Sequence, residues 1–109
     1  MNVTGRWRIV ETELWDRAAI DLLGPAFIEF RSDQTGQFQF VAVEGWMDCD
    51  DGHRDGRPCV EFTWDGDDDG DSASGRGWAA LEPDGSLRGR IYFHLGDDSG
   101  FRAASADGE

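Results

Sequence analysis

A run of aspartates in the middle of the chain has the spacing of calcium ligands. With Asp65 at position one of a calcium-binding loop, Asp67 falls at position three, Asp69 at five and Asp71 at seven. Position twelve, where such a loop needs a bidentate glutamate, is Arg76. The simpler interpretation is therefore a solvated acidic loop. Weak calcium binding by these four aspartates is the alternative, and no other cofactor is expected.

A second group of reactive side chains lies near the C-terminus. His94, Asp97, Asp98 and Ser99 have the composition of a hydrolytic triad. Four residues from one strand end and the turn after it seldom converge as nucleophile, base and orienting group. We therefore expect a surface histidine beside an acidic turn, and a chain that is not an enzyme.

Two cysteines, Cys49 and Cys59, flank His53. The residues from Met1 to Trp7 lack the basic and then apolar pattern of a signal peptide. Cysteines in a chain without an export signal are usually reduced, so free thiols are expected and the location is expected to be the cytoplasm. Three potential ligands in one loop are weak evidence for zinc.

The charge of the chain limits its partners. The 109 residues carry a formal net charge of −13 and contain ten basic residues, all of them arginine. Nucleic acids and anionic membranes are bound through basic surfaces, so neither is an expected partner. The absence of lysine also excludes a lysine base, a Schiff base and a P-loop. A basic protein partner, a cation or a high-salt environment fits this composition better.

Alternating apolar residues indicate β-strands along most of the chain. Residues 5–11, 26–31, 59–64 and 87–95 place apolar side chains at every second position, as in strands with one buried face. In the last of these segments we expect Leu87, Ile91, Phe93 and Leu95 to point inward, and Arg88, Arg90, Tyr92 and His94 to point outward.

Glycine, proline and aspartate predict where the strands end. Residues 33–36 and 83–86 have the composition of turns, and the first of these turns leads into a predicted strand at 37–43. Gly45 is expected to kink or end that strand, and residues 50–58 are expected to form an exposed loop. The N-cap residue Asp16 predicts a short helix that runs to Leu23.

These elements predict an all-β fold in one domain. Seven or eight short strands with tight turns and one short helix between the first two favour a small up-and-down antiparallel β-barrel, because closure removes exposed strand edges. A β-sandwich is the alternative. The domain is expected to span residues 1–104, followed by a flexible tail at 105–109.

The first predicted strand resembles that of the calycins, the superfamily of lipocalins, fatty-acid-binding proteins and avidins. It begins Gly5-Arg6-Trp7, similar to their Gly-x-Trp signature. The resemblance implies a barrel in which Trp7 plugs one end and a basic residue of a late strand, matched here by Arg102, lies over its ring. The short helix likewise resembles the helical lid of fatty-acid-binding proteins.

The chain as a whole also resembles a family of uncharacterised small bacterial proteins. The resemblance covers most of the length and rests on the segments Asp-Leu-Leu-Gly-Pro-Ala, Val-Glu-Phe-Thr-Trp-Asp-Gly and Phe-His-Leu-Gly-Asp-Asp-Ser. It implies no activity.

Two kinds of binding function follow from these features. A calycin-like domain would hold a small apolar ligand near the helix, with Trp15, Ile20, Leu23 and Trp46 as its ligand-binding residues. An acidic inhibitor or immunity-type protein would instead cover a basic partner with residues 48–55 and 65–71. We expect a non-catalytic, soluble binding or interaction domain.

The outward stripe of Arg88, Arg90, Tyr92 and His94 offers a basic surface on an acidic chain. Such a stripe could contact an anionic ligand. Cross-strand ion pairing is the more ordinary use of these positions, and Glu61 and Asp65 are the predicted mates.

Overall fold

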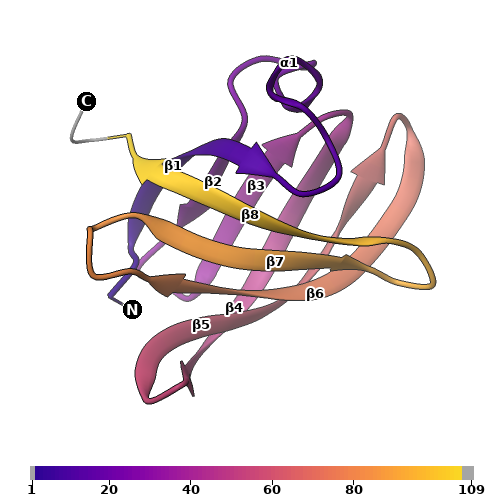
Figure 1. Ribbon diagram of the computed structural model, residues 1–109. Coiled ribbons are helices and arrows are strands. Elements are labelled where there is room, and N and C mark those ends of the chain that lie inside the picture. Colours follow the sequence, from indigo (N-terminus) through magenta and orange to yellow (C-terminus); the bar gives the residue numbers. More distant parts are fainter. Residues whose placement is uncertain (1, 107–109) are drawn as a thin grey trace.

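The computed structural model describes residues 2–106 and shows a closed barrel of eight antiparallel strands, in which each strand pairs with the next and β8 returns to β1 (Figure 1). The predicted barrel with one short helix is confirmed, and the β-sandwich is excluded. The elements are β1 (Gly5–Thr12), α1 (Arg17–Ile20), β2 (Phe27–Phe30), β3 (Thr35–Phe40), β4 (Val43–Arg54), β5 (Arg57–Asp68), β6 (Asp71–Leu81), β7 (Leu87–Phe93) and β8 (Asp98–Ser105).

Aromatic side chains fill the inside of the barrel. The ring of Trp64 lies 5.1 Å from that of Phe38 and 5.3 Å from that of Phe93, both in edge-on contacts. Phe40 extends the cluster, 5.7 Å from Phe38. A void beside Phe40 and Phe101 admits no water-sized sphere. A barrel of eight strands has room for little more than its own side chains, which agrees with this packing.

The strand predicted at 37–43 is interrupted, and Gly45 does not end the strand that follows. β3 stops at Phe40, and Val41 and Ala42 form the turn to β4. Val41 has a φ of 53°, a conformation that β-branched residues rarely adopt, so its residue type does not indicate a turn there. Gly45 lies within β4 against the ring of Phe38, where a Cβ would approach ring atoms to 2.3 Å.

The loop predicted at 50–58 is a hairpin instead. β4 continues to Arg54 and β5 starts at Arg57, so that only Asp55 and Gly56 form the turn. Most of the predicted acidic loop also belongs to strands, because β5 continues to Asp68 and β6 starts at Asp71. The continuous ladder between β4 and β5 overrides the low strand propensity of aspartate and glycine.

The predicted helix is shorter than expected. Asp16 caps it as predicted, and its carboxylate accepts a hydrogen bond from the Ala19 N–H at 2.8 Å. The helix ends at Ile20, which is fully buried, whereas Leu23 is 50% exposed and does not share its face. No helix within residues 2–106 has the length and apolar character needed to cross a membrane.

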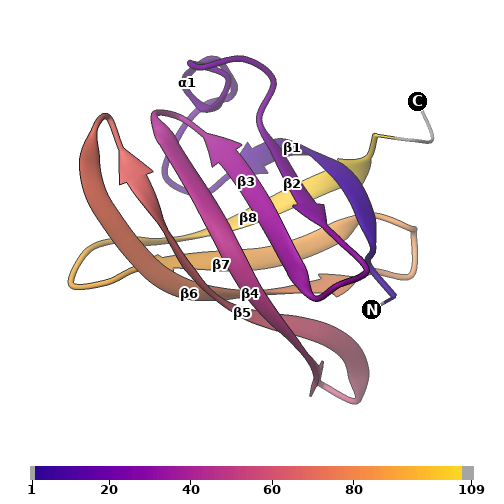
Figure 2. The ribbon, with the colours of Figure 1, turned by 180° about the vertical axis from the view of Figure 1, so that it is seen from behind.

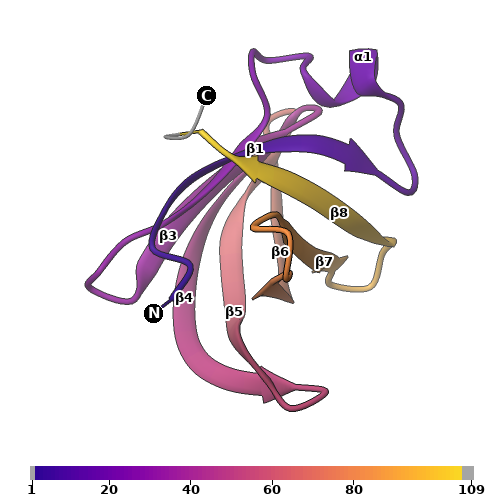
Figure 3. The same cartoon turned by 60° about the vertical axis from the view of Figure 1, so that its left-hand side comes forward.

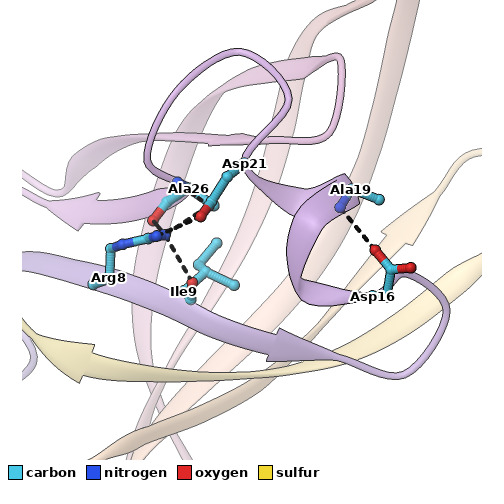
Figure 4. Close-up of polar contacts among 6 residues, drawn as sticks. All are labelled: Arg8, Ile9, Asp16, Ala19, Asp21 and Ala26. Atoms are coloured by element: carbon cyan, nitrogen blue, oxygen red, sulfur yellow. Dashed lines mark hydrogen bonds and ion pairs between the residues drawn. The ribbon is translucent and has the colours of Figure 1, made fainter.

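An ion pair ties this helical segment to the barrel (Figure 4). Arg8 of β1 donates to both carboxylate oxygens of Asp21, at 2.8 and 2.5 Å, and also to the carbonyls of Ile9 and Ala26. Asp21 in turn accepts from the Ala26 N–H at 2.9 Å. These bonds lower the pKa of Asp21 to about 2, chiefly through the guanidinium of Arg8.

Asp21→Asn is expected to reduce stability near neutral pH by about 1 kcal/mol, the scale of a partly exposed ion pair. The folded pKa is depressed, so this stabilisation is present above the unfolded value of 3.8 and is lost as the pH falls through about 2. Urea unfolding from neutral to acid pH checks this. The gap between wild type and variant should close below about pH 4, and a gap that stays constant would contradict it.

The ends of β7 and β8 also differ from the prediction. β7 ends at Phe93, and His94 and Leu95 lie in the turn, where Leu95 is 94% exposed instead of pointing inward. At the other end, β8 includes Ser105, which pairs with Trp7. Ser105 and Ala106 are therefore bonded to β1 instead of forming part of a flexible tail, and residues 107–109 of the predicted tail lie outside the described part of the chain.

Candidate functional site

Most of the ion-paired arginines lie outside β3 and β4. Arg6 of β1 pairs with Glu29 of β2, and Arg102 of β8 pairs with Glu11 of β1. Arg88 of β7 pairs with Glu82, which lies in the turn before β7. The sequence contains no basic residue other than His53 between positions 31 and 54. β3 and the part of β4 before His53 therefore carry no basic side chain that could neutralise the carboxylates near them.

Six carboxylates lie on the outward side of β4 and β5, where they form a surface that we call the acidic face. The strand register places Glu44 directly opposite Asp67, and Asp50 directly opposite Glu61. Like charges in such positions repel one another and destabilise a sheet. Arg54 approaches the edge of this surface, 3.9 Å from Glu61. The acidic face consists of Glu44, Asp48, Asp50, Glu61, Asp65 and Asp67.

Trp46 lies at the centre of the acidic face and is 48% exposed. Its neighbours across the strands are Gln37 of β3 and Asp65 of β5. The flanking residues Gly45 and Met47 are buried, which confirms that Trp46 points out of the barrel. An exposed tryptophan surrounded by carboxylates combines a large apolar anchor with charge, as in the centres of protein interfaces.

The structure does not bring the four predicted ligand-binding residues together. Trp15 packs against Phe40, with ring centroids 5.5 Å apart, and Ile20 is fully buried beside the same end of the barrel. Leu23 and Trp46 are exposed on the outside.

The four aspartates of the predicted calcium site also do not converge. Asp65 and Asp67 project outward from β5, whereas Asp69 lies in the turn with a φ of 53° and Asp71 begins β6 opposite Asp68. Within residues 2–106 no three histidine, cysteine, aspartate or glutamate side chains lie close enough to hold a metal ion.

The residues with a triad composition are divided between the turn before β8 and the two faces of that strand. The carboxylate of Asp98 is bound by Arg90, while Ser99 lies on the opposite face of β8 and is buried. His94 and Asp97 are exposed in the turn between β7 and β8.

The basic stripe is used in ion pairs, but with other mates than those predicted. Arg88 binds Glu82, and Arg90 binds both Glu13 and Asp98. Glu61 and Asp65 are not its mates. A shallow groove over β7 and β8 is lined by these two arginines. Because their guanidinium groups already bind carboxylates, they are not free to bind an anionic ligand in this groove.

The contact between Trp7 and Arg102 that the calycin resemblance implies is absent. Trp7 is buried inside the barrel, and its indole N–H donates to the Val3 carbonyl at 2.9 Å. Arg102 points out of the barrel from β8 and pairs with Glu11. The alternation of β8 puts Phe101 and Ala103 inside and leaves Arg102 outside.

Both cysteines are free and buried, as predicted for reduced thiols. Cys49 lies inside the barrel opposite Phe62, whereas Cys59 lies on the outer side near Trp78. Burial raises the pKa of Cys49 to about 11 and also raises that of Cys59. Neither thiol is therefore poised to react as a thiolate.

Comparison with known proteins adds no relative. No protein-family model matches the chain, and none of the curated proteins is detectably similar to it. The acidic face is therefore identified as a candidate site only from the positions of its residues in the structure. One of its signals was readable in the sequence, namely the lack of arginine between positions 31 and 54. The direct opposition of Glu44 and Asp67 required the strand register.

Proposed function

We propose that this chain is a non-catalytic interaction domain whose acidic face binds a basic protein partner, with Trp46 as the central anchor. The observation that carries the proposal is the pairing of like charges, Glu44 with Asp67 and Asp50 with Glu61, on both sides of an exposed tryptophan. This arrangement costs stability in the free chain. A cationic partner would relieve that cost on binding.

The alternative of a small apolar ligand inside the barrel has less support. Phe38, Trp64 and Phe93 occupy the interior, and the void beside Phe40 and Phe101 holds no water-sized sphere. A ligand of that kind needs a preformed cavity. The free thiols of Cys49 and Cys59 fit action in a reducing compartment, so we propose the cytoplasm as the location.

Capture from an extract of the source cells tests the proposal. The immobilised wild-type chain is compared with Trp46→Ala and with Leu22→Ala, which removes another exposed apolar side chain, 66% exposed and on the segment after α1 instead of on β4 or β5. A basic protein should be retained by the wild type and by Leu22→Ala, and lost with Trp46→Ala. Retention should also weaken between about 0.1 and 1 M salt, because salt screens exposed charges.

Two results would reject the proposal. One is that no basic protein is retained by the wild type at the lower salt concentration. The other is that every retained protein binds Trp46→Ala and Leu22→Ala equally well, since the interaction would then not use the acidic face.

A further inference from the structure

β4 extends beyond its neighbour β3 and leaves one of its edges open. The register between the two strands ends where Thr35 pairs with Asp48, and the N–H of Cys49 then donates to the Gln34 carbonyl at 2.9 Å. β4 continues to Arg54 with β5 as its pairing strand. The hairpin of β4 and β5 projects past the β2–β3 turn in Figures 2 and 3. Within residues 2–106 no strand pairs with this edge of residues 50–54.

The alternation of backbone groups identifies which residues face this open edge. In an antiparallel ladder, successive residues direct their N–H and C=O groups to opposite sides. Cys49 directs its N–H toward the β3 side. The register of β4 with β5 is continuous from Val43 to Arg54, so Asp51 and His53 direct their backbone groups to that same side. Four backbone donors and acceptors are thus available to an added strand.

The side chains at the start of this edge are acidic on both faces of the strand, whereas Arg54 at its end lies 3.9 Å from Glu61. Asp50 belongs to the outward acidic face, and Asp51 projects from the opposite face by the alternation of the strand. Both are exposed. A second copy of this chain would bring the same carboxylates against them, and each copy carries a formal charge of −13. An extended segment with basic side chains on both faces suits the edge instead.

We infer that the partner adds an extended basic segment as an extra strand along the edge of β4 at Asp51 and His53. This inference rests on the proposed function and specifies how the partner is held. Main-chain hydrogen bonds to the edge supply affinity, and the aspartates select for lysine or arginine. The acidic face around Trp46 lies on the same strand, so that one partner contacts both surfaces.

A matched pair of variants at His53 tests the strand addition. His53→Pro removes the N–H that faces the open edge and leaves the ladder to β5 intact, since edge positions tolerate proline. His53→Ala removes the side chain and keeps the N–H. The probe is a synthetic peptide of about six residues, the length of a typical strand, in which two lysines alternate with one threonine so that both faces of the extended peptide carry lysine. A second peptide of the same sequence carries N-methyl groups on alternate amides.

The peptide should bind the wild type and His53→Ala alike, and bind His53→Pro about tenfold more weakly, the scale of a lost hydrogen bond. The N-methylated peptide should bind the wild type weakly. Amide exchange at Asp51 and His53 of the wild type should slow on binding, a readout that needs no variant.

Equal affinity for His53→Pro and His53→Ala, with unchanged amide exchange, would overturn the strand addition. So would a failure of the unmodified peptide to bind the wild type. Neither result bears on whether Trp46 is needed to capture a basic protein, so the proposed function stands or falls separately in the capture experiment.

Discussion

Trp64→Ala is expected to destabilise the fold by about 3–5 kcal/mol, the range for removing a buried aromatic side chain. Trp64 is 3% exposed and its indole N–H donates to the Tyr92 carbonyl at 3.2 Å. Its ring contacts Phe38 and Phe93, so the substitution leaves a cavity between two rings that other side chains already fix. Denaturant unfolding followed by tryptophan fluorescence or circular dichroism measures the change.

Trp46→Ala is the matched control, because it removes the same side chain from an exposed position. Its effect on stability should stay within about 0.5 kcal/mol. If Trp64→Ala cost no more than Trp46→Ala, the barrel interior would not be the packed core described above. A ligand cavity around Trp64 would then become the better account.

The second large effect is on binding. Trp46→Ala should weaken the complex with the captured basic partner by at least about 30-fold, because a central interface tryptophan typically contributes 2 kcal/mol or more. Trp46 is 48% exposed in the free chain, and Gln37 and Asp65 flank it. Calorimetric titration with the purified partner measures the dissociation constant.

Leu22→Ala serves as the control for this binding prediction. It removes an exposed side chain on the segment after α1, and the dissociation constant should be unchanged within a factor of two or so. Comparable losses with both variants would indicate that exposed apolar surface in general, rather than the acidic face, drives the association.

The alternation of apolar residues was enough to predict the barrel. Val60, Phe62 and Trp64 are buried on one face of β5, as their spacing indicates. The turn at Asp84 was also predictable, since its carboxylate accepts from the N–H and hydroxyl of Ser86 at 2.9 and 2.6 Å. Both patterns depend only on residues close together in the sequence, so they can be recognised without knowing which strands pair.

The remaining elements depend on pairing between distant residues. Aspartate and glycine at 65–71 favour a loop by propensity, yet the ladder with β4 and β6 holds most of them in strands. The turn at Val41 has no sequence signal, so the register of β4 on β3 cannot be derived from it. The register of β4 on β5 is set by the two-residue turn Asp55-Gly56, which lies within the segment that the sequence analysis assigns to an exposed loop. The sequence therefore predicts Trp46 as a ligand-binding residue near the helix, whereas the register places it among carboxylates.

The most direct test of the acidic face removes one pair of opposed charges with a minimal change in shape. In the double variant Glu44→Gln/Asp67→Asn, both side chains keep their size and lose their charge. We predict higher stability in urea by about 0.2–1 kcal/mol, because opposed like charges destabilise the ladder, together with weaker binding of the basic partner. Lower stability with unchanged affinity would contradict the account.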